Sequence, residues 1–197
     1  MKLYTIKSEK STFYEIKKST FYAHVVTFDR FDETRARLKK EHPKSRHIVW
    51  ATRYLNEFNQ IVENSSDDGE PKGTSGPSVL NVLRGANLIN VAVLIVRYFG
   101  GIKLGTGGLV RAYSSACNEV LNVADLIIFE SLKSFKIKIT FSQIQKVEYL
   151  LNLLSLEIKS REFGTDGALF LVDVPSSIEQ NFFKEFELLR YEGVEIS

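Results

Sequence analysis

The stretch VAVLIVRYFGGIKLGTGGLVRAY, from Val91 to Tyr113, decides the fold of the first two thirds of this 197-residue chain. Val91 to Tyr98 is a nearly continuous apolar run of strand length, typical of a central strand buried on both faces. The glycine-rich segment FGGIKLGTGG follows, and apolar residues then recur with helical spacing over Leu109–Leu121. The stretch therefore predicts a buried strand, a glycine loop and a helix in succession.

A glycine loop that opens a helix gathers backbone N–H groups at one point, which favours the binding of an anion. The loop does not end in the Gly-Lys-Ser/Thr of a Walker A motif, and Val110 stands where a dinucleotide-binding motif needs its third glycine. The alternative is that the glycines only permit a tight turn against neighbouring backbone. We expect phosphate or nucleic acid to be bound by Lys72, Arg97, Gly100, Gly101, Lys103, Gly105, Thr106, Gly107, Gly108 and Arg111.

Charge is distributed unevenly along the chain. Residues 1–130 contain 18 Lys and Arg against 14 Asp and Glu, whereas residues 131–197 contain 8 against 10. Pro71–Asn118 contains no carboxylate, and Arg30–Arg53 has eight basic residues against three acidic ones. This pattern predicts a basic surface on the N-terminal part that attracts phosphate-rich partners. Cations scattered around a solvated surface would produce the same counts.

Three carboxylates, Asp67, Asp68 and Glu70, lie in the long polar loop Asn64–Gly76. They could chelate Mg²⁺ or act as a general acid and base. The next 48 residues offer no second carboxylate cluster, and the three histidines lack the spacing of metal ligands. We therefore expect the acidic residues to shape the loop, and we expect no catalytic residue, metal site or cofactor.

Strands and helices are also readable on either side of Asn64–Gly76. Strand-forming residues fill Ser11–Phe28. Asp32 can cap a basic helix over Glu33–Glu41, and Pro77 suits the start of a helix that runs to about Leu83. Cys117 falls in the apolar stripe of the helix Leu109–Leu121, which predicts a buried thiol. A strand pair is expected over Arg46–Tyr54 and Phe58–Glu63.

A self-contained pattern begins after the region Ala124–Lys133. Alternation from Phe135 to Phe141 predicts a strand, and Ser142/Gln145 and Ser177/Gln180 predict capping boxes at two helices. The order of elements is βαββαβ, which is that of a ferredoxin-like domain. The fold class is therefore α+β, with domains at residues 1–130 and 131–197.

Composition places the chain among ordinary globular proteins, with 44% apolar and 25% charged residues. The longest strongly apolar run, Val91–Val96, is six residues long, so we expect no membrane span. No secretory signal is readable at the start. With Cys117 as its single cysteine, the chain forms no internal disulfide, and a cytoplasmic location is expected.

The runs DDGEPKGTSGPSVLNVLRG, Asp67 to Gly85, and VAVLIVRYFGGIKLGTGGLVRAY, Val91 to Tyr113, resemble the YigZ/IMPACT family of uncharacterised proteins. The segment EHPKSRHIVWA, Glu41 to Ala51, also matches the family. The resemblance implies an N-terminal domain like domain 2 of ribosomal protein S5 and a ferredoxin-like C-terminal domain. Members are associated with translation control, and no established enzyme reaction comes with the family.

Three hypotheses about function follow. The first is a non-enzymatic binding protein that regulates translation through RNA or a ribosome-associated protein. The second is an enzyme that acts on a phosphorylated small molecule or nucleotide, with Asp67 or Asp68 binding a metal or a proton. The third is a protein-protein adaptor that does not contact nucleic acid.

Overall fold

A computed structural model describes residues 2–197 and divides the chain into two compact units, one ending at Phe129 and the other spanning Glu130–Ser197. Both units combine antiparallel sheets with helices, so the fold class is α+β. Each unit has a hydrophobic core of its own.

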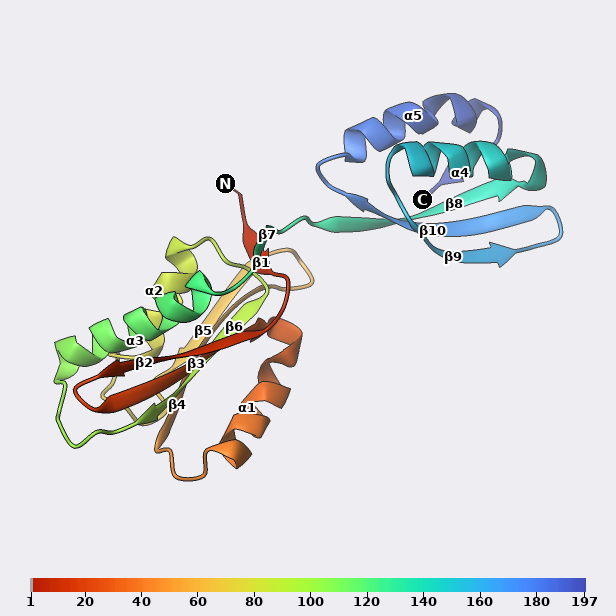
Figure 1. Ribbon diagram of the computed structural model, residues 1–197. Helices are drawn as coiled ribbons and strands as arrows, with labels where there is room; N and C mark the ends of the chain where they lie inside the picture. Colours follow the sequence, from red (N-terminus) through yellow and green to blue (C-terminus); the bar gives the residue numbers. More distant parts are fainter. Residues whose placement is uncertain (1) are drawn as a thin grey trace. The chain divides into compact units, whose positions relative to one another are not determined.

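The first unit is built on a five-stranded antiparallel sheet with the strand order β2-β3-β6-β4-β5. Helices α2 and α3 cover one face of the sheet and α1 covers the other (Figure 1). A separate pair, β1 and β7, joins the two ends of the unit. The elements are β1 (Tyr4–Ile6), β2 (Lys10–Ile16), β3 (Ser19–Thr27), η1 (Phe28–Arg30), α1 (Phe31–Glu41), β4 (His47–Leu55), β5 (Ile61–Ser66), α2 (Gly76–Gly85), β6 (Val91–Tyr98), α3 (Thr106–Asn122) and β7 (Leu126–Ile128).

Strand β6 is the central strand, as the sequence predicts. Its side chains alternate between two cores: Val93 and Ile95 pack beneath α2 and α3, whereas Leu94 and Val96 pack beneath α1. Burial on both faces explains why this strand is apolar at nearly every position. The same alternation sends Arg97 toward the face of α2 and α3.

Helix α3 begins at Thr106, three residues before the apolar stripe that predicts it. Gly105 precedes it with φ at 72°, a conformation that favours glycine. Gly107 and Gly108 therefore belong to the first helical turn, where the backbone N–H groups lack intrahelical partners. Cys117 is fully buried in α3, which confirms the prediction.

The second unit consists of a four-stranded antiparallel sheet in the order β11-β8-β10-β9, with two helices packed on it. Its core includes Ile137, Phe170, Phe182 and Phe186. The elements are β8 (Leu132–Thr140), η2 (Phe141–Gln143), α4 (Ile144–Leu153), β9 (Ile158–Phe163), β10 (Gly167–Pro175), α5 (Glu179–Tyr191) and β11 (Glu195–Ile196).

The predicted capping boxes in this unit are wrong. The capping box before α4 is formed by Thr140 and Gln143, around a short 3-10 turn, so it lies two residues earlier than Ser142/Gln145. Helix α5 starts after Ile178 without a side-chain cap. The sequence pattern misplaces the first cap because the strand ends at Thr140 and the chain turns there at once.

Candidate functional site

The glycine loop Phe99–Gly105 follows β6 and packs closely against the turn between β2 and β3. A side chain on Gly100 would overlap the carbonyl group of Lys18. The Gly100 N–H donates to the Ser19 hydroxyl at 3.1 Å. Gly101, like Gly105, has positive φ. Gly100 is therefore required by a close approach of backbone, whereas Gly101 and Gly105 are required by their conformation.

The turn that meets this loop is itself unusual. Lys17 and Lys18 join β2 to β3 with φ of 47° and 63°, although the two-residue turns that demand positive φ favour Asn and Gly. Both lysines are exposed. Strained backbone at residues other than glycine is concentrated at functional sites. Here the strained turn places two lysines beside the glycine loop.

Asp67 organises the loop between β5 and α2. Its carboxylate accepts hydrogen bonds from the N–H groups of Gly73, Ser75 and Gly76 at 2.7, 2.9 and 2.9 Å. Burial opposes ionisation of Asp67, but the three backbone donors outweigh it and hold the pKa of this carboxyl below its usual range. Asp67 therefore orients the chain that enters α2.

Asp68 ties the same loop to β4. Its carboxylate accepts a hydrogen bond from the Ile48 N–H at 2.6 Å, and its carbonyl accepts one from His47 Nδ1 at 2.7 Å. Within residues 2–197, no group of three or more His, Cys, Asp or Glu side chains is placed to hold a metal ion. Both carboxylate oxygens of Asp67 and Oδ2 of Asp68 accept hydrogen bonds from backbone N–H groups instead.

Glu70 is the centre of a buried network. Its Oε1 accepts a hydrogen bond from Arg97 Nη1 at 2.6 Å and another from the Tyr113 hydroxyl at 2.9 Å. The side chains of Arg97 and Glu70 are only 8% and 4% exposed. Burial, reinforced by the adjacent Glu70 carboxylate, raises the pKa of Tyr113, so its hydroxyl remains a donor.

The Arg97 guanidinium is held between two rings. Its centre lies 5.5 Å from the Phe21 ring and 5.6 Å from the Phe99 ring. Phe99 is 55% exposed, so one of these rings belongs to the surface. The Arg97 Nε is buried and has no hydrogen-bond partner in the described part of the chain. Arg97 is thus fixed in position, and its buried Nε donor is unused.

Two cavities flank Arg97 and Phe99. The first, of about 420 Å³, is basic and is lined by Lys44, Arg46, His47, Arg97, Tyr98 and Phe99. No carboxylate contributes to that lining. We call it the basic pocket.

The second cavity, of about 390 Å³, lies on the glycine-loop side. It is lined by Glu70, Pro71, Arg97, Phe99, Lys103, Leu104, Gly105, Thr106 and Leu109. It is largely apolar, with Lys103 at its wall. We call it the loop pocket.

The structure brings together only part of the predicted phosphate-binding set. Arg97, Lys103, Gly105 and Thr106 line the loop pocket, and Gly100 and Gly101 shape the loop beside it. The remaining members, Lys72, Gly107, Gly108 and Arg111, line neither pocket.

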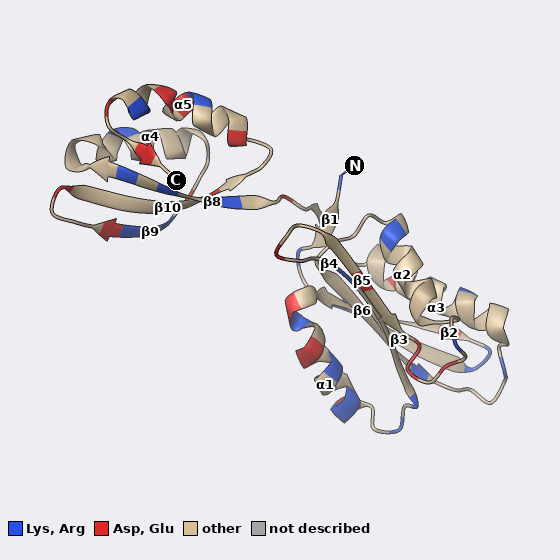
Figure 2. Cartoon of the chain, turned by 180° about the vertical axis from the view of Figure 1, so that it is seen from behind, with Lys and Arg blue, Asp and Glu red and all other residues tan. Residues whose placement is uncertain are grey.

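Lys44, Arg46 and His47 also belong to the site, although the sequence does not predict them as members of it. They lie in the connection from α1 to β4 and at the first residue of β4. Figure 2 shows basic residues gathered along the last turns of α1 and in the loop that follows. The available signal was the basic excess in Arg30–Arg53, but only the fold places that segment beside Arg97.

Cys117 is fully buried, and burial raises the pKa of its thiol to about 12, which disfavours the nucleophilic thiolate. None of the helices in the described part of the chain has the length and hydrophobicity that a membrane-spanning segment requires.

Comparison with known proteins identifies relatives. The profile of the Impact N-terminal domain matches residues 17–121. An IMPACT family member of Haemophilus influenzae is 36% identical over 168 residues, covering 84% of this chain and 82% of its own. The IMPACT family member YigZ of Escherichia coli is 34% identical over 142 residues, covering 70% and 69%.

Similarity extends to eukaryotic proteins and to a solved structure. The protein IMPACT of Rattus norvegicus is 34% identical over 95 residues, which cover 45% of this chain and 29% of the rat protein. The crystal structure of a hypothetical protein matches with a TM-score of 0.67 at 27% identity, covering 99% of this chain and 96% of that one.

Proposed function

Because this chain belongs to the IMPACT family, we propose that it is a non-enzymatic binding protein that regulates translation in the cytoplasm through RNA or a ribosome-associated partner. We further propose that its first unit is like domain 2 of ribosomal protein S5 and its second unit is ferredoxin-like. The second assignment is supported by the βαββαβ order and by the strand order β11-β8-β10-β9.

The observation that carries this proposal is the basic pocket. Lys44 and Arg46 line it beside Arg97, whose charge is compensated by Glu70, and no carboxylate contributes to the lining. Lys44 and Arg46 are exposed and, within residues 2–197, form no ion pair. Such cations bind the phosphate groups of a nucleic acid, and these contacts do not depend on its base sequence. The partner's phosphate groups therefore account for most of the affinity that we expect.

A salt titration of RNA binding tests the proposal. The variant Lys44→Ala/Arg46→Ala/Lys103→Ala should bind a fluorescein-labelled RNA more weakly. If each cation contacts one phosphate, it should also lower the slope of log affinity against log salt by about 2. The matched control is Lys7→Ala/Lys136→Ala/Lys184→Ala, which removes the same charge from exposed positions elsewhere. Equal effects of the two variants, or none, would contradict the proposed site.

The alternative functions predict other results. An enzyme that acts on a phosphorylated small molecule needs a carboxylate available to a metal ion or a proton, whereas Asp67 and Asp68 are bonded to backbone N–H groups. Metal-dependent turnover that is lost in Asp68→Asn would favour the enzyme. A protein-protein adaptor predicts partners that remain bound after nuclease treatment.

A further inference from the structure

One part of the sheet in the first unit is left uncovered. Helix α1 packs on Val26, Ile48, Leu94 and Val96, which belong to β3, β4 and β6. No residue of β2 takes part in that core. On the face that α1 covers elsewhere, β2 and β3 expose two rings, Phe13 at 60% and Tyr22 at 38%.

These rings begin a continuous series. Phe13 and Tyr22 are paired across β2 and β3, with ring centres 6.5 Å apart. Tyr22 lies 6.0 Å from Tyr98, edge to face, and 5.6 Å from the His42 ring, on which it stacks. His42 Nδ1 and the Tyr98 hydroxyl share a hydrogen bond of 3.1 Å. We call Phe13, Tyr22, His42 and Tyr98 the aromatic row.

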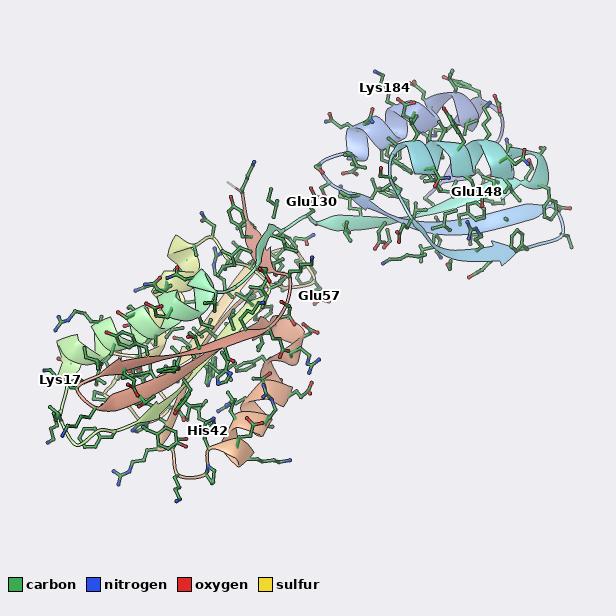
Figure 3. All side chains as sticks on the ribbon, viewed as in Figure 1. Lys17, His42, Glu57, Glu130, Glu148 and Lys184 are labelled. Atoms are coloured by element: carbon green, nitrogen blue, oxygen red, sulfur yellow. The ribbon has the colours of Figure 1, made fainter. Side chains whose placement is uncertain are left out.

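The aromatic row leads into the cations of the site. Tyr98 lines the basic pocket with Lys44 and Arg46. His42 lines a smaller adjoining recess of about 190 Å³ with Lys39 and Arg46. Figure 3 shows His42 just beyond the end of α1, on the same unit as Lys17 at the tip of the β2–β3 hairpin.

Few carboxylates lie near the His42 and Tyr98 end of the aromatic row. Asp68 lines the recess with His42 and accepts a hydrogen bond from the Ile48 N–H at 2.6 Å, and Glu41 pairs with Arg37 at 3.5 Å. Glu15 lies on β2 and accepts a hydrogen bond from the Thr20 hydroxyl at 3.2 Å. His24, on the same face of β3, is neutral at physiological pH because burial lowers its pKa to about 4. Lys39, Lys44 and Arg46 therefore dominate the charge at this end of the row.

We propose that the aromatic row stacks the unpaired bases of single-stranded RNA whose phosphates lie on Lys39, Lys44 and Arg46. Exposed rings beside a track of cations suit a single strand, because every base has a face that stacks while the backbone follows the charge. In a duplex the bases are paired and stacked on one another, so they are not available to stack on protein side chains. This inference rests on the proposed function and names the class of RNA.

The direct test compares the variant Phe13→Ala/Tyr22→Ala with the unaltered chain. Neither ring belongs to a hydrophobic core of the first unit, so we expect the variant to fold. Binding to a labelled 12-nucleotide single strand should weaken at least about tenfold, since loss of one stacked base alone costs about that much. Binding to a duplex of the same sequence and the salt slope should not change. The control is Phe163→Ala/Tyr191→Ala, which removes two exposed rings from the second unit.

A second variant gives a direct signal. Phe13→Trp keeps an aromatic ring, so it should retain affinity, and its fluorescence should be quenched when a single strand stacks on it. Absence of quenching at saturating RNA would overturn the inference.

The outcomes separate this inference from the proposed function. If Phe13→Ala/Tyr22→Ala binds the single strand normally while Lys44→Ala/Arg46→Ala/Lys103→Ala does not, the aromatic row is not a base platform and the proposed function stands. If the unaltered chain binds no RNA, both fail. Loss of a dimer in Phe13→Ala/Tyr22→Ala, measured by sedimentation, would assign the row to a second copy of the chain and overturn the inference.

Discussion

Arg97 Nη1 lies 2.6 Å from Oε1 of Glu70 in a buried pair, and Arg97 lines both the basic pocket and the loop pocket. The carboxylate holds the guanidinium at the wall shared by the two pockets. Because Tyr113 donates to the same oxygen, the network also connects β6 to α3.

Removal of Glu70 should destabilise the first unit. Glu70→Ala leaves Arg97 buried without its partner, so the free energy of unfolding should fall by about 3 kcal/mol. Fluorescence of Trp50, the only tryptophan, reports unfolding of this unit in denaturant. Glu33→Ala, which breaks the exposed pair with Arg30, should cost less than about 1 kcal/mol. Additive losses in Glu70→Ala/Arg97→Ala would show that the two residues do not interact.

Gly100 should tolerate no side chain. In Gly100→Ala the new methyl group meets the Lys18 backbone, which cannot rotate away as a side chain can, so we expect a loss of about 3 kcal/mol. Gly85→Ala is the matched control because nothing lies within 4 Å of its added atom. That variant should be neutral or slightly stabilising, as measured by the same Trp50 unfolding curve. Similar stabilities for the two variants would contradict the close approach.

Replacing Lys17 and Lys18 by residues that suit their turn should raise the stability of the first unit and lower its affinity for RNA. Lys17→Asn/Lys18→Gly supplies residues suited to positive φ, so the free energy of unfolding should rise by about 1 kcal/mol. If these lysines contact RNA, affinity should fall because two charges are lost. Lys17→Ala/Lys18→Ala removes the same charges but keeps the strain, so it should lower affinity without a gain in stability. Equal stability of the two double variants would refute the strain argument.

Asp67 should contribute stability that depends on pH. Its folded-state pKa lies below the unfolded value of about 3.9, so its contribution is complete above that value and is lost as the pH falls through the folded-state pKa. The unaltered chain should therefore be more stable than Asp67→Asn at pH 7, and the difference should shrink below about pH 4. Urea unfolding measured from pH 3 to 7 checks this. Glu57→Gln, at an exposed turn position, should show no comparable change.

Cys117 should resist alkylation in the folded protein. It is fully buried and burial raises its pKa to about 12, so little thiolate forms at pH 8. Mass spectrometry after incubation with iodoacetamide should find the native chain unmodified and the urea-unfolded chain fully modified. Rapid modification of the native chain would mean that α3 opens readily.

Strand β6 and the helices α2 and α3 were predictable because their signals are local. Backbone geometry alone sets the direction in which each side chain of a strand or a helix points. An uninterrupted apolar run therefore predicts a strand buried on both faces, and an apolar repeat of 3.6 residues predicts a helix with one buried face. The start of α3 and the cap before α4 were misjudged, since both depend on where the chain turns. The glycines at positions 107 and 108 predict a loop, but in the structure they lie in the first turn of α3.

By itself, the sequence determined the α+β class, the central strand, the buried thiol and the basic character of two separate segments. Only the tertiary structure decided that Lys44 and Arg46 would share a pocket with Arg97, and that Arg97 would be bonded to a carboxylate 27 positions away in the chain. The reason is physical: periodicity specifies which side of an element is buried, whereas the partner of a charge depends on strand order and on the paths of connecting loops. Neither of these has a local signature in the order of residues.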